Sequence, residues 1–480
     1  MCEGNKHSKI TRRTFLKNSA TAAAGLTMLP TSVIGNFRPR TPGNILKSSG
    51  YSDKESKIYF EKGSENETLT INDIRKGLYS AFDQMGVKKK VMAIPPDYTR
   101  LHSEGGLITQ LTHDYFGDRL TDILPALGTH APMTGEQMNK MYGDIPKDIF
   151  HVHDWRNDIV TVGEVPGEYV NKISEGKVDY PWPAQVNKML VEGDHDLILS
   201  IGQVVPHEVT GMANFNKNIF VGTGGSEGIN KSHFLGAVYG MERMMGRAKT
   251  PVRDVLNYAS QNFTNHLPIV YVLTVMDRAS NGEMVMRGLF IGNDMQCFEK
   301  AAELSINVNF TMLEKPLEKV VVYLDPEEYE STWLGNKSIY RTRMAIADEG
   351  ELIVLAPGVK KFGEDPTNDK LIRKYGYIGT PRTLELTEKN RDLQDNLSVA
   401  AHLIHGSSEN RFSITYCPGK LSKEEIESVN FQYADLDAMM EKYPPQRMKE
   451  GYNKMADGEQ VYYISNPGAG LWAWKEKFSL

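Results

Sequence analysis

Cysteine is scarce in this chain, and its scarcity excludes two kinds of site. The 480 residues contain three cysteines, Cys2, Cys297 and Cys417, and no CxxC pair. A disulfide framework or a thiolate zinc site needs more cysteines at closer spacing. Cys297 and Cys417 can pair with each other, but no wider framework is available.

Several catalytic signatures are also missing. The chain has no His-Glu-x-x-His and no Gly-x-Ser-x-Gly sequence. A glycine-rich segment at 222–232 resembles a phosphate loop, but Ile229 and Asn230 separate Gly228 from Lys231 and Ser232. A Walker loop needs glycine, lysine and serine in direct succession, so that the backbone amides and the lysine reach the same phosphates. The segment therefore does not predict a nucleotide hydrolase.

Excess positive charge and long apolar runs are absent too. The net charge is -6 and the isoelectric point is near 6.1. A nucleic-acid or anionic-membrane partner is normally matched by a basic surface. The apolar segment from Ala20 to Leu29 is too short and too rich in Ala, Thr and Gly to span a bilayer. We therefore expect no nucleic-acid partner and no stable membrane insertion.

The amino terminus has the pattern of an export signal. Arg12 and Arg13 are followed by Phe-Leu-Lys and then by the mild apolar segment. This resembles a twin-arginine signal, which exports folded proteins. We expect a signal peptide at 1–36, a linker at 37–56 and a periplasmic location, with the twin-arginine export machinery as a transient partner.

The rest of the chain predicts an α/β protein. Its length exceeds what one core usually supports, so two domains are expected, at 57–312 and 313–480. Apolar runs alternate with segments of helical spacing. We expect strands at 90–94, 122–127, 196–201, 268–275, 287–292, 319–324 and 351–355, and helices at 73–85, 104–116, 252–262, 294–307 and 331–347, with others around Leu371, Ala400 and Glu425.

Three of these strands end at polar side chains. Asp97 and Arg100 follow the strand at 90–94, His130 follows the strand at 122–127, and His207 follows the strand at 196–201. Ligands of open α/β sheets bind at the carboxyl ends of the strands. Lys217 and His233 follow His207 in a loop broken by glycines. The sequence therefore predicts one site containing these residues.

The residues alone leave the chemistry open. Imidazoles supply acid–base catalysis and metal ligands, and a lysine can act as a nucleophile. His130, His207 and His233 have the composition of a three-histidine zinc site with an open water position. A zinc-dependent hydrolase is therefore one alternative.

The ordered set of motifs resembles the nickel-pincer lactate racemase family. The matching residues are Asp97-Tyr98-Thr99-Arg100, Gly128-Thr129-His130, Pro206-His207, Lys217 and His233. The resemblance implies two α/β domains with the active site in the interdomain cleft. It also implies the nickel-pincer nucleotide, nickel pyridinium-3,5-bisthiocarboxylic acid mononucleotide, as cofactor, with Ni as the metal. Proteins that make this cofactor would then be transient partners.

The resemblance also implies residue roles. Lys217 would hold the cofactor covalently, and His233 would be a nickel ligand beside two sulfurs and a carbon, an arrangement that suits Ni(II). His130 and His207 would be the acid–base pair. Arg100 and Lys337 would bind the substrate carboxylate, with Asp97 and Trp333 also in the substrate site. The activity implied is racemisation or epimerisation of a 2-hydroxy acid at carbon 2 by hydride transfer.

Three departures from the family concern the pocket. Ala213-Asn214-Phe215 replaces Ser-Gly-Gly, Trp333-Leu334 replaces a common Tyr-Gln, and Leu101 replaces a proline. We therefore expect a substrate larger than lactate, such as a sugar acid. A homologue that binds a carboxylate or the cofactor without catalysis is a further alternative.

Overall fold

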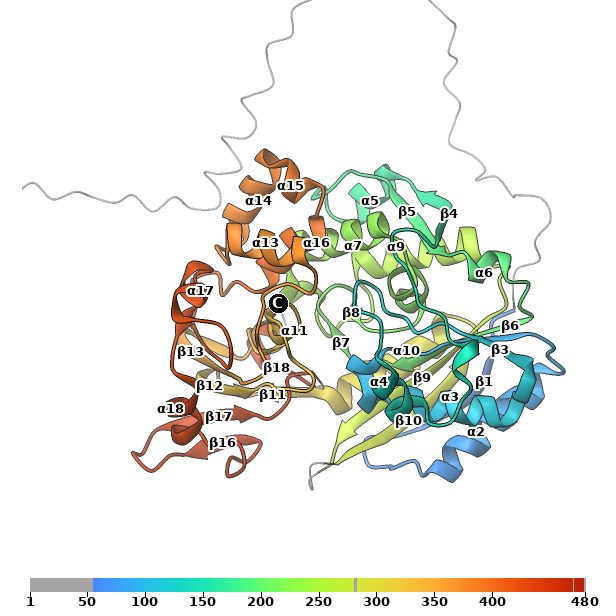
Figure 1. Ribbon diagram of the computed structural model, residues 1–480, viewed down its shortest axis with the longest axis horizontal. Helices are drawn as coiled ribbons and strands as arrows, with labels where there is room; N and C mark the ends of the chain where they lie inside the picture. The colour runs from blue at the N-terminus through green and yellow to red at the C-terminus, as the bar shows by residue number, and fades with distance from the viewer. Residues whose placement is uncertain (1–54, 280–282, 469, 479–480) are drawn as a thin grey trace, which may run out of the picture. The chain divides into compact units, whose positions relative to one another are not determined.

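The computed structural model describes residues 55–279, 283–468 and 470–478. The predicted signal peptide, Cys2 and all but the last two residues of the predicted linker lie outside the described residues. The described residues contain two large sheets, each with parallel strands at its centre (Figure 1). The predicted α/β class is confirmed.

The first sheet has six strands in the order β1-β10-β9-β6-β2-β3. Strands β9, β6, β2 and β3 are parallel, whereas β10 runs antiparallel to both β9 and β1. Their bounds are β1 Ile58–Gly63, β2 Val91–Ile94, β3 Leu120–Ile123, β6 Leu197–Gln203, β9 Ile269–Arg278 and β10 Met284–Gly292.

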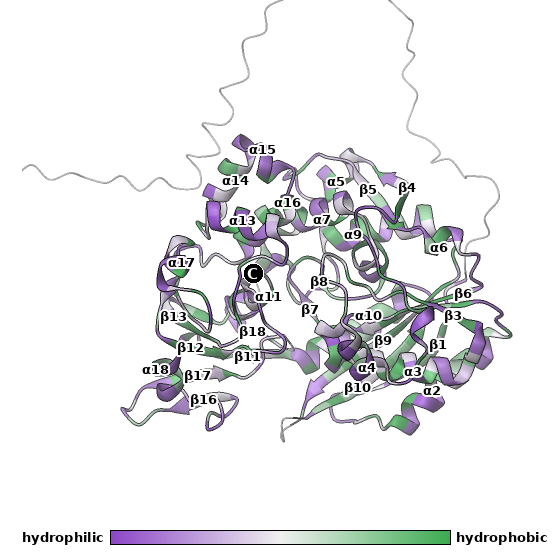
Figure 2. Ribbon diagram, in the orientation of Figure 1, coloured by the Kyte–Doolittle hydropathy of each residue, from purple (hydrophilic) through white to green (hydrophobic). Residues whose placement is uncertain are grey.

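Both faces of this sheet are buried, which is why its central strands read as continuous apolar runs. Val91, Leu197 and Val270 belong to the core beneath α2 (Ile71–Met85) and α3 (Gly105–Phe116). Met92 and Ile198, one position further along, belong to the opposite core with α9 (Pro251–Ala259) and α10 (Met295–Asn309). Successive side chains of a strand point to opposite faces, so both faces need helices. Figure 2 shows the mixed hydropathy of these covering helices.

The second sheet has the order β15-β14-β13-β12-β17-β16, parallel except for β16. Its strands are β12 Leu317–Tyr323, β13 Ile346–Ala356, β14 Ser413–Pro418, β15 Gln432–Tyr433, β16 Gly451–Lys454 and β17 Gln460–Ile464. Its cores involve α13 Pro366–Tyr375, α16 Leu397–His405, α17 Lys423–Ser428 and α18 Leu436–Lys442. The predicted domain boundary at 312/313 falls at the end of β11 and stays a prediction.

Three two-stranded sheets complete the strands. They are β4 (Ile159–Val165) with β5 (Trp182–Asn187), β7 (Pro206–His207) with β8 (Gly211–Met212), and β11 (Phe310–Leu313) with β18 (Leu471–Trp474). The remaining α-helices are α4 Gly135–Tyr142, α5 Gly167–Ile173, α6 Met189–Glu192, α7 Ser226–Tyr239, α8 Met241–Met244, α11 Thr332–Gly335, α12 Lys337–Tyr340, α14 Thr380–Lys389, α15 Arg391–Gln394 and α19 Lys475–Phe478.

Two predicted segments were wrong. The helix expected at 331–347 is instead two single-turn helices, α11 and α12, followed by β13 from Ile346. Gly335 and Asn336 interrupt it, because glycine has a poor helix propensity and the asparagine side chain competes for backbone hydrogen bonds. The expected loop carrying His233 is largely helical, since α7 begins at Ser226. In addition, β3 lies at 120–123 rather than 122–127.

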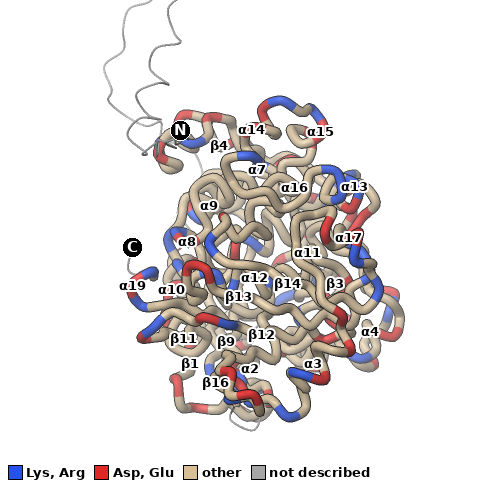
Figure 3. Tube along the Cα trace, turned by 90° about the vertical axis from the view of Figure 1, so that its left-hand side faces the viewer, with Lys and Arg blue, Asp and Glu red and all other residues tan. Residues whose placement is uncertain are grey.

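The described cysteines and surface add little to the list of possible sites. Cys297 and Cys417 are both buried and free, in different hydrophobic cores. Figure 3 shows basic and acidic residues interspersed along the chain. Among the described residues, no helix has both the length and the apolar character needed to cross a membrane.

Candidate active site

All eight residues predicted for the site line one cavity of about 140 Å³. The order β6-β2-β3 places the ends of three parallel strands side by side, which brings together the side chains that follow them. Trp333 and Lys337 reach the same cavity from α11 and α12. Some residues that line the cavity therefore follow strands of the first sheet, and others lie on the two short helices α11 and α12. The predicted residues are Asp97, Arg100, His130, His207, Lys217, His233, Trp333 and Lys337.

His130 is held by a carboxylate. Its Nδ1 lies 2.5 Å from Oδ2 of Asp97, and the other oxygen of Asp97 accepts hydrogen bonds from the backbone N–H and hydroxyl of Thr99. Burial alone would raise the pKa of Asp97, but His130 and Thr99 hold this pKa below its usual value. The carboxylate is therefore ionised and accepts a hydrogen bond from Nδ1–H of His130. This leaves Nε2 as the ring nitrogen of His130 that can exchange a proton with a substrate.

His207 has the opposite arrangement. It is buried in the short strand β7, and its Nδ1 accepts a hydrogen bond of 3.1 Å from the backbone N–H of Val209. A neutral histidine whose Nδ1 accepts must carry its proton on Nε2. Burial, with the nearby charge of Lys217, lowers the pKa of His207 well below its usual value. His207 is therefore a neutral donor at rest.

The backbone at Lys217 is held in place by its neighbour, whereas its side-chain amine makes no hydrogen bond or ion pair within the described parts of the chain. The next residue, Asn218, donates hydrogen bonds of 3.1 Å to the Ile94 carbonyl in β2 and to the Ser200 hydroxyl in β6. Asn218 also begins a π-helical turn, a feature found frequently at functional sites. Burial and the charge of Arg100 lower the pKa of Lys217 to about 8. Its amine is thus more nucleophilic near neutral pH than an exposed lysine.

His233 is oriented as a nitrogen ligand. On α7, its Nδ1 lies 2.7 Å from the carbonyl oxygen of Ile229, one helical turn earlier. A carbonyl can only accept, so Nδ1 carries the proton and Nε2 keeps its lone pair. Burial lowers the pKa of His233 to about 4, so the ring is neutral at physiological pH. A second hydrogen bond of this kind is what commonly fixes a metal-binding histidine.

The cations opposite the histidines lack anionic partners. Lys337 is 7 % exposed and lies over the ring of Tyr329, with no hydrogen bond or ion pair in the described residues. Burial and the charges of Arg100 and Arg341 lower its pKa to about 7. Nη1 of Arg100 is buried and has no hydrogen-bond partner in the described residues. Two such cations form a site for a carboxylate, since an unpaired buried charge is costly.

Trp333 forms a rigid wall of the cavity. Its ring stacks on His402 of α16 at a centroid distance of 4.5 Å. The Nε2 atom of His402 is in turn 2.8 Å from the hydroxyl of Tyr377. The hydrogen bond to Tyr377 holds His402 in place, and the stacking of Trp333 on His402 therefore leaves the indole little freedom to turn.

The three-histidine zinc site is not formed. Within the described residues, no three His, Cys, Asp or Glu side chains are grouped as a metal site would need. His130, His207 and His233 each use Nδ1 in a separate contact: with a carboxylate, with a backbone N–H and with a carbonyl. Their donor set instead fits a metal that brings most of its ligands with it and takes one imidazole from the protein.

Several residues of the cavity were missed at the sequence level. Glu208 directly follows His207, and its Oε2 lies 3.7 Å from Nδ1 of His207. Both polar atoms of the Gln203 side chain are buried without a partner in the described residues. Tyr340 also lines the cavity. The adjacency of Glu208 to His207 was the only available signal, because an isolated carboxylate in a loop has no distinctive pattern.

The turn between His207 and Lys217 has an unusual backbone. Asn214 and Phe215 have φ values of 63° and 59°, a left-handed conformation that favours glycine. The Phe215 ring packs on Tyr271 and Phe298 at centroid distances of 4.3 and 5.1 Å. Arg253 donates to the carbonyls of Met212 and Asn214. The turn thus keeps a shape typical of glycines although it contains none between Met212 and Lys217.

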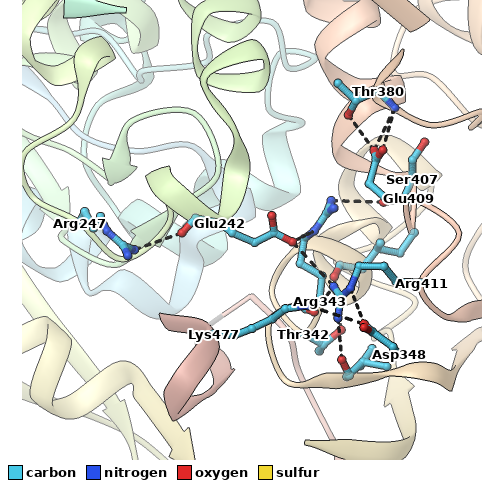
Figure 4. Close-up of polar contacts among 12 residues, drawn as sticks. Glu242, Arg247, Thr342, Arg343, Asp348, Thr380, Ser407, Glu409, Arg411 and Lys477 are labelled. Atoms are coloured by element: carbon cyan, nitrogen blue, oxygen red, sulfur yellow. Dashed lines mark hydrogen bonds and ion pairs between the residues drawn. The ribbon is translucent and has the colours of Figure 1, made fainter. Parts of the chain in front are cut away.

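A polar network joins segments from the two halves of the chain (Figure 4). Glu242 of α8 lies 3.1 Å from Nε of Arg343 and 3.8 Å from Nη1 of Arg411. Arg411 also bonds to Asp348, which lies 3.6 Å from Lys477 of α19. One carboxylate of the first half therefore connects to two arginines of the second.

Comparison with known proteins finds a family match over part of the chain. Residues 77–245 match the family described as lactate racemase N-terminal domain. This segment contains Asp97, His130, His207, Lys217 and His233. Over these residues the resemblance to the lactate racemase family is confirmed.

Two solved structures have this lactate racemase-like fold. A protein from Thermotoga maritima is 27 % identical, with a TM-score of 0.73 over 86 % of this chain and 100 % of that one. The lactate racemase apoprotein from Thermoanaerobacterium thermosaccharolyticum is 17 % identical, with a TM-score of 0.60 over 86 % of this chain and 94 % of that one. No curated protein sequence matches significantly. The family match over residues 77–245 supports an isomerase of the racemase or epimerase type at the family level.

Proposed function

We propose that this lactate racemase-like chain inverts carbon 2 of a 2-hydroxy acid larger than lactate, using a nickel-pincer nucleotide bound to Lys217. The observation that carries the proposal is the gathering of the eight residues predicted for the site around one cavity, with two histidines whose Nδ1 atoms have opposite hydrogen-bond partners, a carboxylate and a backbone N–H. Inversion needs a proton acceptor and a proton donor, one on each side of the carbon.

The residues fit the implied cofactor. Lys217 offers an amine with a lowered pKa and no hydrogen-bond or ion-pair partner in the described residues, and His233 offers a free Nε2. Arg100 gives the cavity positive charge for an anionic group. When bound, the nickel-pincer nucleotide supplies a hydride acceptor and donor, so that no dianion need form at carbon 2.

The histidines move the hydroxyl proton. Nε2 of His130 takes the proton from the substrate hydroxyl, while Asp97 holds the resulting imidazolium through Nδ1. The intermediate is then a 2-keto acid, held through its carboxylate by Arg100 and Lys337. His207 carries the proton for the opposite face. Trp333 limits the space in which the keto acid reorients.

Support for the substrate class comes from a second cavity of about 220 Å³ that shares lining residues with the first. Its lining includes Thr134, Gln137, Glu328, Glu330 and Glu364. Carboxylates and amides accept hydrogen bonds from hydroxyl groups but repel a second carboxylate. A 2-hydroxy acid with a hydroxylated tail, as in a sugar acid, suits this extension better than lactate or a dicarboxylic acid.

The test is to purify the chain from a host that makes the cofactor. Intact mass and metal analysis should give one adduct on the Lys217 peptide and one nickel per chain. Chiral chromatography of hydroxy acids after incubation should show inversion at carbon 2 of sugar acids. An unmodified Lys217 with bound zinc would contradict the cofactor assignment, and inversion of lactate alone would contradict the substrate class.

Two variants separate the roles. Lys217→Ala should lose the adduct and all turnover yet keep its unfolding temperature, whereas a nickel-loaded, active Lys217→Ala chain would contradict the attachment. His207→Ala should keep the adduct and lose turnover. Retention of nickel without any inversion in the wild-type chain would instead indicate a cofactor-binding homologue.

We also propose export to the periplasm through the signal at Arg12 and Arg13. Replacing both residues by lysine should keep the protein in the cytoplasm, where the precursor is detected by its mass. Unchanged export of the double variant would contradict this route.

A further inference from the structure

The two histidines of the cavity differ in how Nδ1 is used. Nδ1 of His130 meets the Asp97 carboxylate at 2.5 Å, so a proton there is stabilised. Nδ1 of His207 meets the backbone N–H of Val209, so a proton there would face another donor. The first arrangement favours a base at Nε2, and the second opposes it.

This difference matters because a reversible inversion needs both histidines to act as bases. With substrate of the opposite configuration, His207 must take the hydroxyl proton on Nε2. In the resting tautomer that nitrogen already carries a proton. His207 can become a base only if Nδ1 is protonated instead, and the proton on Nε2 has been released.

A carboxylate lies near enough to accept a hydrogen bond from a protonated Nδ1 of His207. Oε2 of Glu208 lies 3.7 Å from Nδ1 of His207, too far for a hydrogen bond but within reach of a small rotation. The same oxygen is buried and has no hydrogen-bond partner in the described residues. Burial would raise the pKa of Glu208, but the charge of Arg341 holds it below its usual value, so the side chain is ionised.

We propose that Glu208 is the positioning residue of His207. Its Oε2 accepts a hydrogen bond from Nδ1–H when His207 changes tautomer, and Nε2 is then free to take the substrate's hydroxyl proton. One proton leaves Nε2 for solvent and one arrives at Nδ1, so charge is conserved and nothing is oxidised or reduced. Glu208 thereby does for His207 what Asp97 does for His130. The assignment rests on the racemase function proposed above.

The surroundings of His207 and Glu208 allow this change. The charged groups acting on His207 are Glu208, Lys217, Arg100 and Arg341, so Glu208 is the anion among them. Behind Glu208, Nε and Nη2 of Arg341 are buried and lack partners in the described residues, as does Nε2 of His405. Glu208 is thus not fixed by a hydrogen bond on its far side.

A merely structural role would make Glu208 the counter-charge of Arg341, and two variants distinguish this from positioning. Glu208→Asp keeps the charge but withdraws the carboxylate by one methylene. Glu208→Gln removes the charge and keeps the shape. Positioning predicts that both lower kcat, by about 100-fold for Gln and at least about 10-fold for Asp, with KM changed less than about two-fold. A structural role predicts that Asp retains kcat.

Glu242→Gln is the matched control, because Glu242 also compensates two arginines but approaches no histidine. It should leave kcat unchanged. Wild-type turnover in Glu208→Asp, or an equal loss of kcat in Glu242→Gln, would overturn the assignment.

A measurement without turnover separates this inference from the proposed function. In the cofactor-free full chain with ¹⁵N-labelled histidine, His207→Gln identifies the signals of His207. The Nδ1 and Nε2 shifts of the wild type should report mainly the resting Nε2–H tautomer with a measurable minor population of the Nδ1–H tautomer, and Glu208→Gln and Glu208→Asp should lose this minor population. Identical shifts in all three chains would refute the role of Glu208. If no acid is inverted yet these shifts differ, the proposed reaction fails while the tautomer control stands.

Discussion

The Asp97 carboxylate and the His130 imidazole form a pair whose hydrogen bonds are complete. Oδ2 of Asp97 meets Nδ1 of His130 at 2.5 Å, and Oδ1 accepts the hydroxyl and the N–H of Thr99. Both oxygens of the carboxylate are therefore used, which fixes the direction in which the imidazole points. The base of the site is held ready before any substrate arrives.

Asp97→Asn should lower kcat by about 100-fold or more, because the amide cannot stabilise a proton on Nδ1 of His130. Steady-state kinetics with each stereoisomer of the substrate measures the change. Asp122→Asn is the control, since Asp122 contacts His151 and His195, neither of which lines the cavity. Equal losses in the two variants would show that the effect is not specific to the site.

Lys337→Met should stabilise the cofactor-free chain at pH 6 and lose this advantage at higher pH. The pKa of Lys337 falls to about 7 in the folded chain, chiefly through burial. The unfolded chain binds its proton up to a pKa of about 10.4, so wild-type stability rises with pH between these two values. The cost of the charged lysine is complete below pH 7 and is relieved between pH 7 and 10.

Chemical denaturation of both chains at several pH values tests this sign. The gap between Lys337→Met and wild type should narrow steadily from pH 7 upward. A constant gap would mean that the ammonium group finds a partner in solution. A wild type more stable than the variant at pH 6 would contradict the expected sign.

Arg343→Met should destabilise the fold by about 2–3 kcal/mol, because Glu242 loses its closest partner and the Ser407 carbonyl loses a donor. Arg343 is 4 % exposed, so water cannot replace it fully. Arg382→Met is the matched control: its ion pair with Glu385 is exposed, and its loss should cost less than about 1 kcal/mol. Urea unfolding curves give both values, and similar costs would mean that the network of Figure 4 contributes little.

Phe215→Ala should cost about 3 kcal/mol or more, since a buried ring packed on Tyr271 and Phe298 is lost. Asn214→Gly should be neutral or stabilising by up to about 1 kcal/mol, because glycine adopts a positive φ without strain. Thermal unfolding measures both. A large loss in Asn214→Gly would mean that the asparagine side chain, rather than its backbone, maintains the turn.

The sequence predicted the part of the site that depends on parallel strands. Asp97, His130 and His207 each follow an apolar run, and the ends of parallel strands meet at one edge, so their convergence needed no knowledge of packing. Lys337 lines the same cavity although the helix predicted for it was wrong, because it was chosen from the family resemblance and not from the helix. Strand β3 was predicted to run too far because Leu124 and Ala126 are apolar and still donate backbone hydrogen bonds to Ala93 and Pro95, although the regular strand ends at Ile123.

Other features depend on contacts that a linear sequence does not display. Glu208 becomes notable only when its oxygen is seen without a partner near Nδ1 of His207. The link between Glu242 and Arg343 joins residues that are 101 positions apart. The left-handed turn at Asn214 and Phe215 replaces glycines by packing, and no local propensity indicates it.

That turn has a consequence for how the site responds to its cofactor. Flexible glycines would have to be ordered when Lys217 is modified, and the lost chain entropy would weaken attachment. Here the aromatic contacts of Phe215 and the hydrogen bond from Arg253 to the Asn214 carbonyl already fix the turn before Lys217. The amide hydrogens of residues 211–217 should therefore exchange with solvent almost as slowly in the cofactor-free chain as in the loaded one.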